Sequence, residues 1–459
     1  MDLPTAFLDR MKNLLGDLFP DFLAASEKKA VRGLRVNPLK MNCDTFERVV
    51  GFGCDKIPYV HGGYTFDFDG IGRSPLHHSG AIYVQEPAAM AVMESLDIGA
   101  DFNVLDMCAS PGGKSMQAAS KNTNGIIVSN EYVGARAQIL LQNAERLGLR
   151  NSIITSLDSR DIADFYPDTF DLTVVDAPCS GEGMMRKSET AVSEWSEDNV
   201  RNCAERQKYI LDNAAKTVKR GGFLLYSTCT YSLEENEMTV DAFLCEHREF
   251  SIIDVNRKVK EYSSDGIEFD GCKSKDIRKC RRFYAGINAG EGQFIALMSK
   301  DSDVGNVQPP KKNTYCNKGE QRILNVAREF IEENTVSFDF DRFLLSIRSD
   351  GIYIAPRFEV MRAGVVSLGV KLGEERKGRI IPHHRFFMAF GSDFIRKVDL
   401  ADGKVFGEGA AQKYIHGDTL PFDGEDGFYA VTWNGATLGG GKASGGVMKN
   451  HYPKGLRNP

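Results

Sequence analysis

The alternation of strand-like and helix-like segments between about residues 100 and 300 is the feature that most constrains the fold. Short apolar stretches that suit strands lie at 103–106, 125–130, 152–155, 170–176, 222–227 and 293–299. Helix-like segments separate most of them, at 115–120, 133–147, 198–218 and 233–247. This order is typical of an α/β domain whose parallel strands have helices on both faces. We therefore predict a doubly wound α/β core with a mixed, mostly parallel sheet.

The remainder of the 459-residue chain is long enough for further domains. We predict an α+β domain over 1–95, the α/β core over 96–302 and a linker over 303–318, where Pro309 and Pro310 stand among few hydrophobic residues. The Gly-rich remainder has short strand-like runs. It predicts two small β-rich units, 319–390 and 391–459.

Composition excludes several classes of protein. The apolar runs are too short for a transmembrane helix, and no basic segment followed by an apolar one opens the chain. A cytoplasmic protein with no membrane contact is expected, and we expect a monomer. The ten cysteines include no CxxC pair and no close Cys/His cluster. We therefore expect neither a disulfide framework nor a metal site. The net charge of −6 argues against a histone-like nucleic-acid binder but leaves room for local basic patches.

A loop of small residues follows the first predicted strand, where doubly wound sheets bind nucleotides. It comprises Cys108, Ala109, Ser110, Pro111, Gly112, Gly113 and Lys114. It matches neither GxGxxG nor the P-loop pattern, so a dinucleotide dehydrogenase and a P-loop phosphotransferase are both disfavoured. Acids end or follow the next three strands: Glu131, Asp158 and Asp176. Each alone is typical of a helix cap or a solvated turn, but together they indicate one ligand across the sheet edge.

Two cysteines follow the last two strands of the parallel set. Cys179 lies in Asp176-Ala177-Pro178-Cys179-Ser180-Gly181, and Cys229 lies in Ser227-Thr228-Cys229-Thr230. They stand 50 positions apart in sequence but are predicted to be neighbours at one sheet edge. A single cysteine beside a strand is usually packing, whereas two in small polar loops beside a ligand loop indicate thiol chemistry.

These three loops resemble the signature motifs of the NOL1/NOP2/Sun family of S-adenosylmethionine-dependent RNA cytosine-5 methyltransferases. The segments 35–40 and 83–90 also fit, and the end of the chain, with 414–418 and 448–457, resembles the bacterial RsmF-type branch. The resemblance covers nearly the whole chain. It implies a Rossmann-like class I methyltransferase core, a PUA-like RNA-binding domain near the C-terminus, and 16S ribosomal RNA of the small subunit as substrate.

The resemblance also implies roles for the candidate residues. A thiolate that adds to carbon 6 of cytosine makes carbon 5 nucleophilic, and chemistry alone does not decide which cysteine attacks. By resemblance Cys229 is the nucleophile and Cys179 assists breakdown of the adduct. Asp176 could protonate or hydrogen-bond ring nitrogen 3 if burial raises its pKa. The cofactor, S-adenosylmethionine, is expected at residues 108–114 and at Glu131, Asp158 and Asp176.

Basic residues on two segments are candidate RNA contacts. Arg186 and Lys187 follow the Cys179 loop, and a basic stretch over 273–282 includes Arg278, Lys279, Arg281 and Arg282. Basic groups next to Phe283 and Tyr284 suit single-stranded RNA, although a charged surface turn explains them equally well. Two alternatives stay open: the same chemistry on transfer RNA, or a catalytically inactive RNA-binding factor for ribosome assembly.

Overall fold

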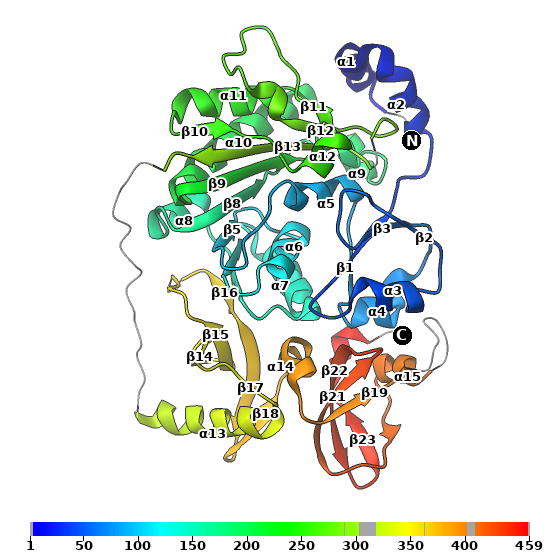
Figure 1. Cartoon of the computed structure of the whole chain (residues 1–459), viewed down its shortest axis with the longest axis vertical. Coiled ribbons are helices and arrows are strands. Elements are labelled where there is room, and N and C mark those ends of the chain that lie inside the picture. Colours follow the sequence, from blue (N-terminus) through cyan, green and yellow to red (C-terminus); the bar gives the residue numbers. More distant parts are fainter. Residues whose placement is uncertain (1–2, 289, 303–317, 362, 402–408, 458–459) are drawn as a thin grey trace.

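The protein is described by a computed structural model covering residues 3–288, 290–302, 318–361, 363–401 and 409–457. The predicted linker at 303–318 lies outside these residues except for its last position. The α/β core and the N-terminal region form the upper part of the molecule in Figure 1, and the C-terminal strands form the lower part.

A ten-stranded mixed sheet forms the centre of the upper part, in the order β11-β12-β13-β9-β8-β5-β6-β7-β16, with β10 paired to β13. The five strands from β9 to β7 are parallel, and strands beyond them on both sides pair antiparallel. The predicted mixed sheet is thus confirmed, with its parallel part in the middle. The strands are β5 (Val104–Asp106), β6 (Ile127–Asn130), β7 (Ser152–Thr155), β8 (Phe170–Asp176), β9 (Val218–Thr228), β10 (Phe250–Ile252), β11 (Ser264–Asp265), β12 (Arg281–Phe283), β13 (Gln293–Lys300) and β16 (Val365–Leu368).

Helices cover both faces of this sheet. Buried side chains of α6 and α7 pack in one core cluster, and those of α8, α10 and α11 pack in another. The strand order reverses beside β5, because β6 and β7 extend the sheet to one side and β8 and β9 to the other. Ligands bind at such switch points. The helices are α6 (Gly113–Lys121), α7 (Gly134–Leu147), α8 (Ser159–Phe165), α9 (Glu189–Ser193), α10 (Glu197–Thr217), α11 (Glu237–Glu246) and α12 (Arg257–Glu261).

The start of α11 differs from the prediction, which placed it at 233. The side chain of Asn236 donates to the carbonyl of Thr230 at 3.0 Å and accepts from the Thr228 hydroxyl at 2.6 Å. These bonds hold residues 233–236 as a turn against the preceding loop, so the helix begins only at Glu237. Side chains that bond local backbone compete in this way with helix formation.

The N-terminal region is the predicted α+β unit. Two helices precede a four-stranded antiparallel sheet of order β2-β3-β1-β4, and α5 then leads into the core. Its elements are α1 (Thr5–Leu15), α2 (Phe19–Ser26), β1 (Gly33–Val36), α3 (Cys43–Val49), β2 (Cys54–Lys56), β3 (Gly63–Phe66), α4 (Pro75–His78), β4 (Ile82–Val84) and α5 (Pro87–Glu94).

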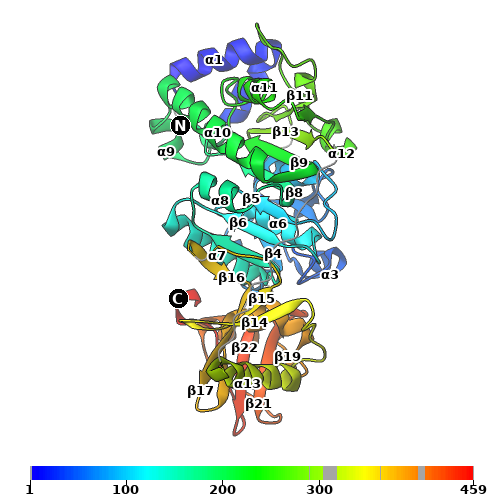
Figure 2. The same cartoon turned by 90° about the vertical axis from the view of Figure 1, so that its left-hand side faces the viewer.

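The C-terminal region is β-rich and holds two further sheets, β14-β15-β17-β18 and β19-β21-β22-β23-β20. Figure 2 shows these strands as a body below the main sheet. Its elements are α13 (Lys318–Asn334), β14 (Phe343–Arg348), β15 (Gly351–Pro356), β17 (Val370–Arg376), β18 (Arg379–Pro382), α14 (His384–Phe390), β19 (Lys397–Asp399), α15 (Ala410–His416), β20 (Leu420–Pro421), β21 (Gly427–Trp433), β22 (Ala436–Ser444) and β23 (Val447–Asn450).

Two contacts cross the domain limits predicted for this region. β16 pairs with β7 and so extends the sheet of the α/β core. Phe386 and Phe390 of α14 share one hydrophobic cluster with Ala430 of β21, which joins the two C-terminal sheets across the limit predicted at residue 390. The second contact buries apolar side chains of α14 and β21, so the two C-terminal sheets share part of one core.

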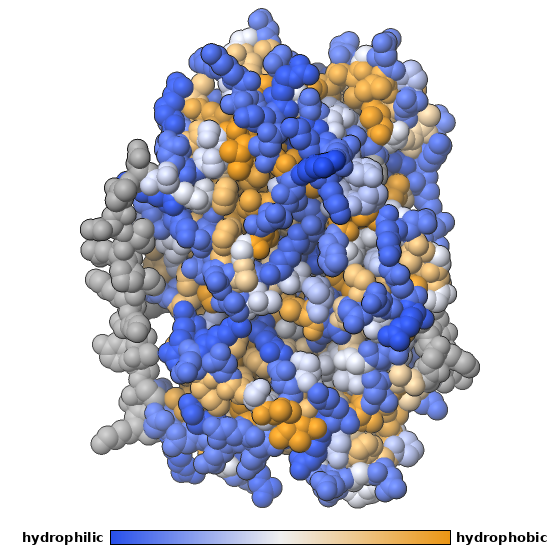
Figure 3. Space-filling model, viewed as in Figure 1, coloured by the Kyte–Doolittle hydropathy of each residue, from blue (hydrophilic) through white to orange (hydrophobic). Residues whose placement is uncertain are grey.

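On the face seen in Figure 3, hydrophobic residues stand in groups among hydrophilic ones. Within the described ranges, every helix is too short or too polar to cross a bilayer.

Candidate active site

The loop that links β5 to α6 brings its backbone to the carboxyl edge of the sheet. Ala109 donates its backbone N–H to the carbonyl of Asn130, and the Ser110 carbonyl accepts from the Arg136 guanidinium at 3.0 Å. Gly112 has a φ of 113° and directly precedes α6. A Cβ there would lie 2.9 Å from Leu140 and 3.0 Å from Met116. The position therefore requires glycine in both conformation and space.

The acids predicted to bind the cofactor lie at the ends of neighbouring strands. Glu131 follows β6, is 4% exposed and accepts the backbone N–H of Val133 at 2.9 Å. Asp158 follows β7, caps α8 through the N–H of Arg160 and accepts from the Tyr209 hydroxyl at 2.8 Å. The structure thus places both carboxylates at the edge where the loop 108–114 lies, and Asp158 also serves as a helix cap.

Asp106, at the end of β5, is a buried carboxyl group that the sequence analysis did not single out. It accepts from the Ser115 hydroxyl at 2.6 Å, and its other oxygen is buried with no hydrogen-bond partner within the described residues. Burial raises the pKa of Asp106 to about 7. The Ser115 hydrogen bond opposes this rise and the nearby charge of Asp176 adds to it.

The raised pKa makes folding stability depend on pH. Between about pH 4 and pH 7 the folded chain keeps the Asp106 proton, whereas the unfolded chain has lost it. We therefore expect the free energy of unfolding to fall as pH rises through this window, by up to about 1.4 kcal/mol per pH unit. Urea unfolding of the wild type and of Asp106→Asn from pH 4.5 to 8 measures the contribution of Asp106 to this pH dependence, because the variant has no carboxyl group at position 106. Equal pH slopes for the two proteins would refute the assignment.

Asp176, at the end of β8, connects the cofactor loop to the cysteine loops. Its carboxylate lies 2.7 Å from the Lys114 ammonium and accepts from the Ser227 hydroxyl at 2.7 Å. Burial lowers the pKa of Lys114, but the charge and hydrogen bond of Asp176 outweigh burial and the net shift is upward. The expectation that Asp176 donates a proton or hydrogen bond to the base stays a prediction. The structure adds a second carboxyl group, Asp106, whose pKa is raised by burial.

The structure brings the two predicted cysteines together. The sulfur atoms of Cys179 and Cys229 lie 3.3 Å apart, on the loops that follow β8 and β9, and both residues are partly exposed. Gly183, in the Cys179 loop, also packs closely on Gly292 before β13, where a Cβ on Gly183 would lie 2.7 Å from the Gly292 Cα atom. Gly183 also donates its N–H to the Cys229 carbonyl at 2.9 Å.

The surroundings of the two thiols differ. The pKa of Cys179 is raised well above its usual value by its hydrogen bond to Cys229, by burial and by the negative charge of Glu235. Lys114 lies near Cys229, which adds to the rise in the pKa of Lys114. The surroundings therefore favour a protonated thiol at Cys179.

Three of the six predicted RNA-contacting residues are structural. Arg282 is 1% exposed and pairs with Glu237, and it donates to the Tyr231 carbonyl at 2.7 Å. Arg281 is 3% exposed and binds Asp265 and the Ser263 hydroxyl. Arg186 is mostly buried and pairs with Glu291 at 2.7 Å. Most donors of these three side chains are thus used inside the fold, and the prediction that they contact RNA stays a prediction.

We expect loss of Arg282 to affect stability and not RNA binding. Arg282→Met leaves the Glu237 carboxylate buried without its partner, which should lower the free energy of unfolding by about 3–5 kcal/mol. The matched control is Arg278→Met at an exposed position, where the change should stay within about 0.5 kcal/mol. Denaturant unfolding measures both. A larger cost for Arg278→Met than for Arg282→Met would contradict the burial argument.

The other three basic residues stay available to a ligand. Lys187 and Arg278 are exposed, and Lys279 is partly exposed in an ion pair with Asp276 at 2.9 Å. Phosphate contacts through such residues would position RNA without specifying its sequence.

Three family models match successive parts of the chain: the N-terminal domain of 16S rRNA methyltransferase RsmF over 3–87, 16S rRNA methyltransferase RsmB/F over 93–299, and the methyltransferase RsmF PUA domain over 407–458. The chain belongs to the RsmF-type branch of the NOL1/NOP2/Sun methyltransferases. Relatives called ribosomal RNA small subunit methyltransferase F match over nearly the full length. That of Vibrio vulnificus is 29% identical and covers 99% of this chain and 97% of its own. That of Shewanella sp. strain MR-4 is 29% identical over 95% of this chain and 93% of its own.

Solved structures agree with this family in the fold. A methyltransferase homologue from Pyrococcus horikoshii is 28% identical, with a TM-score of 0.56, over 65% of this chain and 95% of that chain. NSun6 from the same organism, in a structure with SFG, has a TM-score of 0.55 at 21% identity, over 65% of this chain and 99% of that chain, and supports the fold alone.

Within this family fold, the site includes residues that the sequence analysis missed. Ser227 and Asn130 stand at strand ends, and Asn130 donates to the carbonyls of Met107 and Leu157, which ties three loops together. Glu182 and Glu235 lie buried behind the cysteines. Their position a few residues after Cys179 and Cys229 was a usable signal, but an acid in a polar loop is usually solvated.

Proposed function

We propose that this methyltransferase transfers the methyl group of S-adenosylmethionine to carbon 5 of a cytidine in 16S ribosomal RNA, through a covalent adduct with Cys229. The observation that carries the proposal is the pair of sulfurs 3.3 Å apart, partly exposed and adjoining the Lys114–Asp176 ion pair. This arrangement places the proposed nucleophile, a second thiol and the Lys114–Asp176 ion pair at one edge of the sheet.

The residues at the sheet edge fit S-adenosylmethionine. Asp106 has a buried oxygen with no partner among the described residues, and Glu131 offers a carboxylate at the end of β6. Carboxylates at such strand ends bind ribose hydroxyls or an ammonium group. When bound, S-adenosylmethionine supplies an electrophilic methyl group to carbon 5.

Cys229 performs the covalent step in this proposal. Its thiolate adds to carbon 6 of cytosine, and the new carbon–sulfur bond moves electron density to carbon 5. After methylation, a base takes the proton from carbon 5 and the electron pair of that carbon–hydrogen bond restores the double bond between carbons 5 and 6. The carbon–sulfur bond then breaks, and Cys229 leaves as the thiolate. The surroundings of Cys179 support this choice of nucleophile, because its hydrogen bond to Cys229, its burial and the charge of Glu235 favour the protonated thiol there.

Asp176 holds the base in this proposal. Its carboxylate has lone pairs beyond those used by Lys114 and Ser227, so it can accept a hydrogen bond from the amino group on carbon 4 of cytosine. Cys179 keeps its proton and assists breakdown of the adduct, at 3.3 Å from the sulfur that must leave.

The RNA substrate follows from the relatives' names and from the PUA family match. To test it, the purified full chain is incubated with methyl-labelled S-adenosylmethionine and naked 16S RNA, small subunits or transfer RNA. We expect 5-methylcytidine, identified by mass spectrometry, in 16S RNA or the small subunit. Label in transfer RNA alone would favour the alternative substrate, and no label in any RNA would favour an inactive assembly factor. Either result would overturn the proposal.

A further inference from the structure

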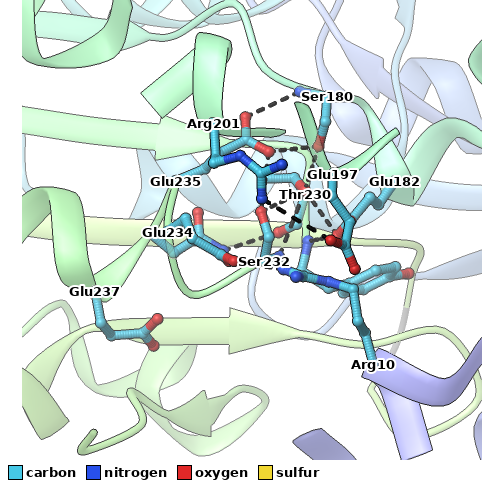
Figure 4. Close-up of polar contacts among 12 residues, drawn as sticks. Arg10, Ser180, Glu182, Glu197, Arg201, Thr230, Ser232, Glu234, Glu235 and Glu237 are labelled. Atoms are coloured by element: carbon cyan, nitrogen blue, oxygen red, sulfur yellow. Dashed lines mark hydrogen bonds and ion pairs between the residues drawn. The ribbon is translucent and has the colours of Figure 1, made fainter. Parts of the chain in front are cut away.

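Two buried glutamates connect the cysteine loops behind the sulfur atoms. Glu235 belongs to the loop of Cys229 and is 0% exposed, and Glu182 follows Cys179 and is 4% exposed. Figure 4 shows their carboxylates directed at Ser180 and Thr230, the residues that directly follow the two cysteines. Each glutamate therefore reaches from one cysteine loop to the other.

Glu235 accepts four hydrogen bonds. The backbone N–H and the hydroxyl of Ser180 each donate to one carboxylate oxygen, the first at 2.9 Å. Gln207 of α10 and Ser232 donate at 2.8 Å and 2.9 Å. Burial raises the pKa of Glu235, and these four hydrogen bonds to both oxygens oppose that rise by stabilising the ionised carboxylate.

Glu182 makes the reciprocal connection. It accepts from the Thr230 hydroxyl at 2.8 Å and from the Tyr231 N–H at 2.9 Å, both on the Cys229 loop. The Trp195 indole donates to its other oxygen at 2.9 Å. Both loops are thus fixed by buried, charge-assisted hydrogen bonds, which are stronger than neutral ones.

The charge of Glu235 is met by neutral donors only. Among the described residues, no lysine or arginine forms an ion pair with it, whereas its sequence neighbour Glu234 pairs with Arg10 at 2.7 Å. The negative charge of Glu235 therefore acts on nearby groups with little compensation. One of these groups is Cys179, which directly precedes Ser180, the residue that donates to Glu235.

We propose that Glu235 is a positioning residue that holds the Cys179 loop against the Cys229 loop and, through its charge, keeps the proton on Cys179. This proposal rests on the proposed function, in which Cys229 is the attacking thiolate and Cys179 stays protonated. The other titratable groups around the cysteines are Tyr226 on β9, Cys203 with Arg206 on α10, Glu182, and the Lys114–Asp176 pair. Glu235 is the anion among them that bonds directly to the Cys179 loop.

The experiment compares Glu235→Gln with Glu234→Gln, an adjacent glutamate that is partly exposed and bonds to α1 instead of the cysteine loops. Site-resolved alkylation by iodoacetamide, followed by mass spectrometry from pH 6 to 9, reports the thiolate fraction of each cysteine without RNA. We expect Glu235→Gln to raise the alkylation rate of Cys179 about three- to tenfold near pH 8. Glu234→Gln should match the wild type.

Methylation is measured on the same proteins. Glu235→Gln should lower the single-turnover rate about 10- to 100-fold, with binding of S-adenosylmethionine nearly unchanged. Glu235→Asp keeps the charge but shortens its reach, so Cys179 should stay slow to alkylate while methylation falls. This variant keeps the proposal testable if Glu235→Gln does not fold.

A Cys179 alkylation rate in Glu235→Gln equal to that of the wild type would overturn the proposal, as would fast alkylation of Cys179 in Glu235→Asp. Because alkylation needs no RNA, a failure of the proposed RNA chemistry leaves this result readable. The two proposals therefore fail separately.

Discussion

Replacing Cys229 with alanine should abolish methyl transfer to RNA and formation of any covalent RNA complex. Only a sulfur anion at this position can add to carbon 6, and Cys179 cannot substitute for it, because burial and the charge of Glu235 favour its protonated form. We expect the methylation rate to fall by at least about a thousand-fold, the scale on which loss of a nucleophile acts. Incorporation of labelled methyl groups into 16S RNA measures it.

The matched control is Cys245→Ala on α11, a partly exposed cysteine outside the site. It should keep wild-type activity. Binding of S-adenosylmethionine to Cys229→Ala should change little, since alanine at this position leaves the Lys114–Asp176 ion pair and Glu131 in place. Methylation by Cys229→Ala at more than a few per cent of the wild-type rate would assign the attack to another group.

The order of strands and helices in the core could be predicted because it depends on local patterns. Apolar runs such as 170–176 are buried on both faces, and this signal is visible without tertiary contacts. The pairing of β16 with β7 could not be predicted, because the two strands lie about two hundred positions apart in sequence. The same holds for the core that joins α14 to β21.

The candidate site was predictable where chemistry follows strand ends, as at Cys179, Cys229 and Lys114. It was not predictable where charge is neutralised at long range. In the sequence, Arg282 resembles a surface cation, because its partner Glu237 lies 45 residues earlier and local patterns do not show the pairing. Asp106 and Asp176 end strands in the same way, and only the tertiary structure shows that Asp176 pairs with Lys114 whereas Asp106 bonds to Ser115.

Replacing Cys179 with alanine should have the opposite effect on the covalent complex, which should accumulate. Cys229 can still attack carbon 6, but the thiol 3.3 Å from its sulfur no longer assists the breakdown of the adduct. We expect a band of protein–RNA complex that resists denaturation, with multiple-turnover methylation reduced at least about 100-fold. Gel analysis after incubation with 16S RNA and S-adenosylmethionine measures both.

The double variant Cys179→Ala/Cys229→Ala decides what the complex means. If the trapped species is a Cys229 adduct, the double variant forms none, whereas adventitious crosslinking through another of the cysteines would persist. A Cys179→Ala protein that turns over like the wild type would show that the second sulfur has no part in release. The short distance between the sulfurs would then reflect packing of the two loops, which the glutamates alone suffice to hold. The two cysteine variants therefore separate attack from release, because one blocks the carbon–sulfur bond from forming and the other from breaking.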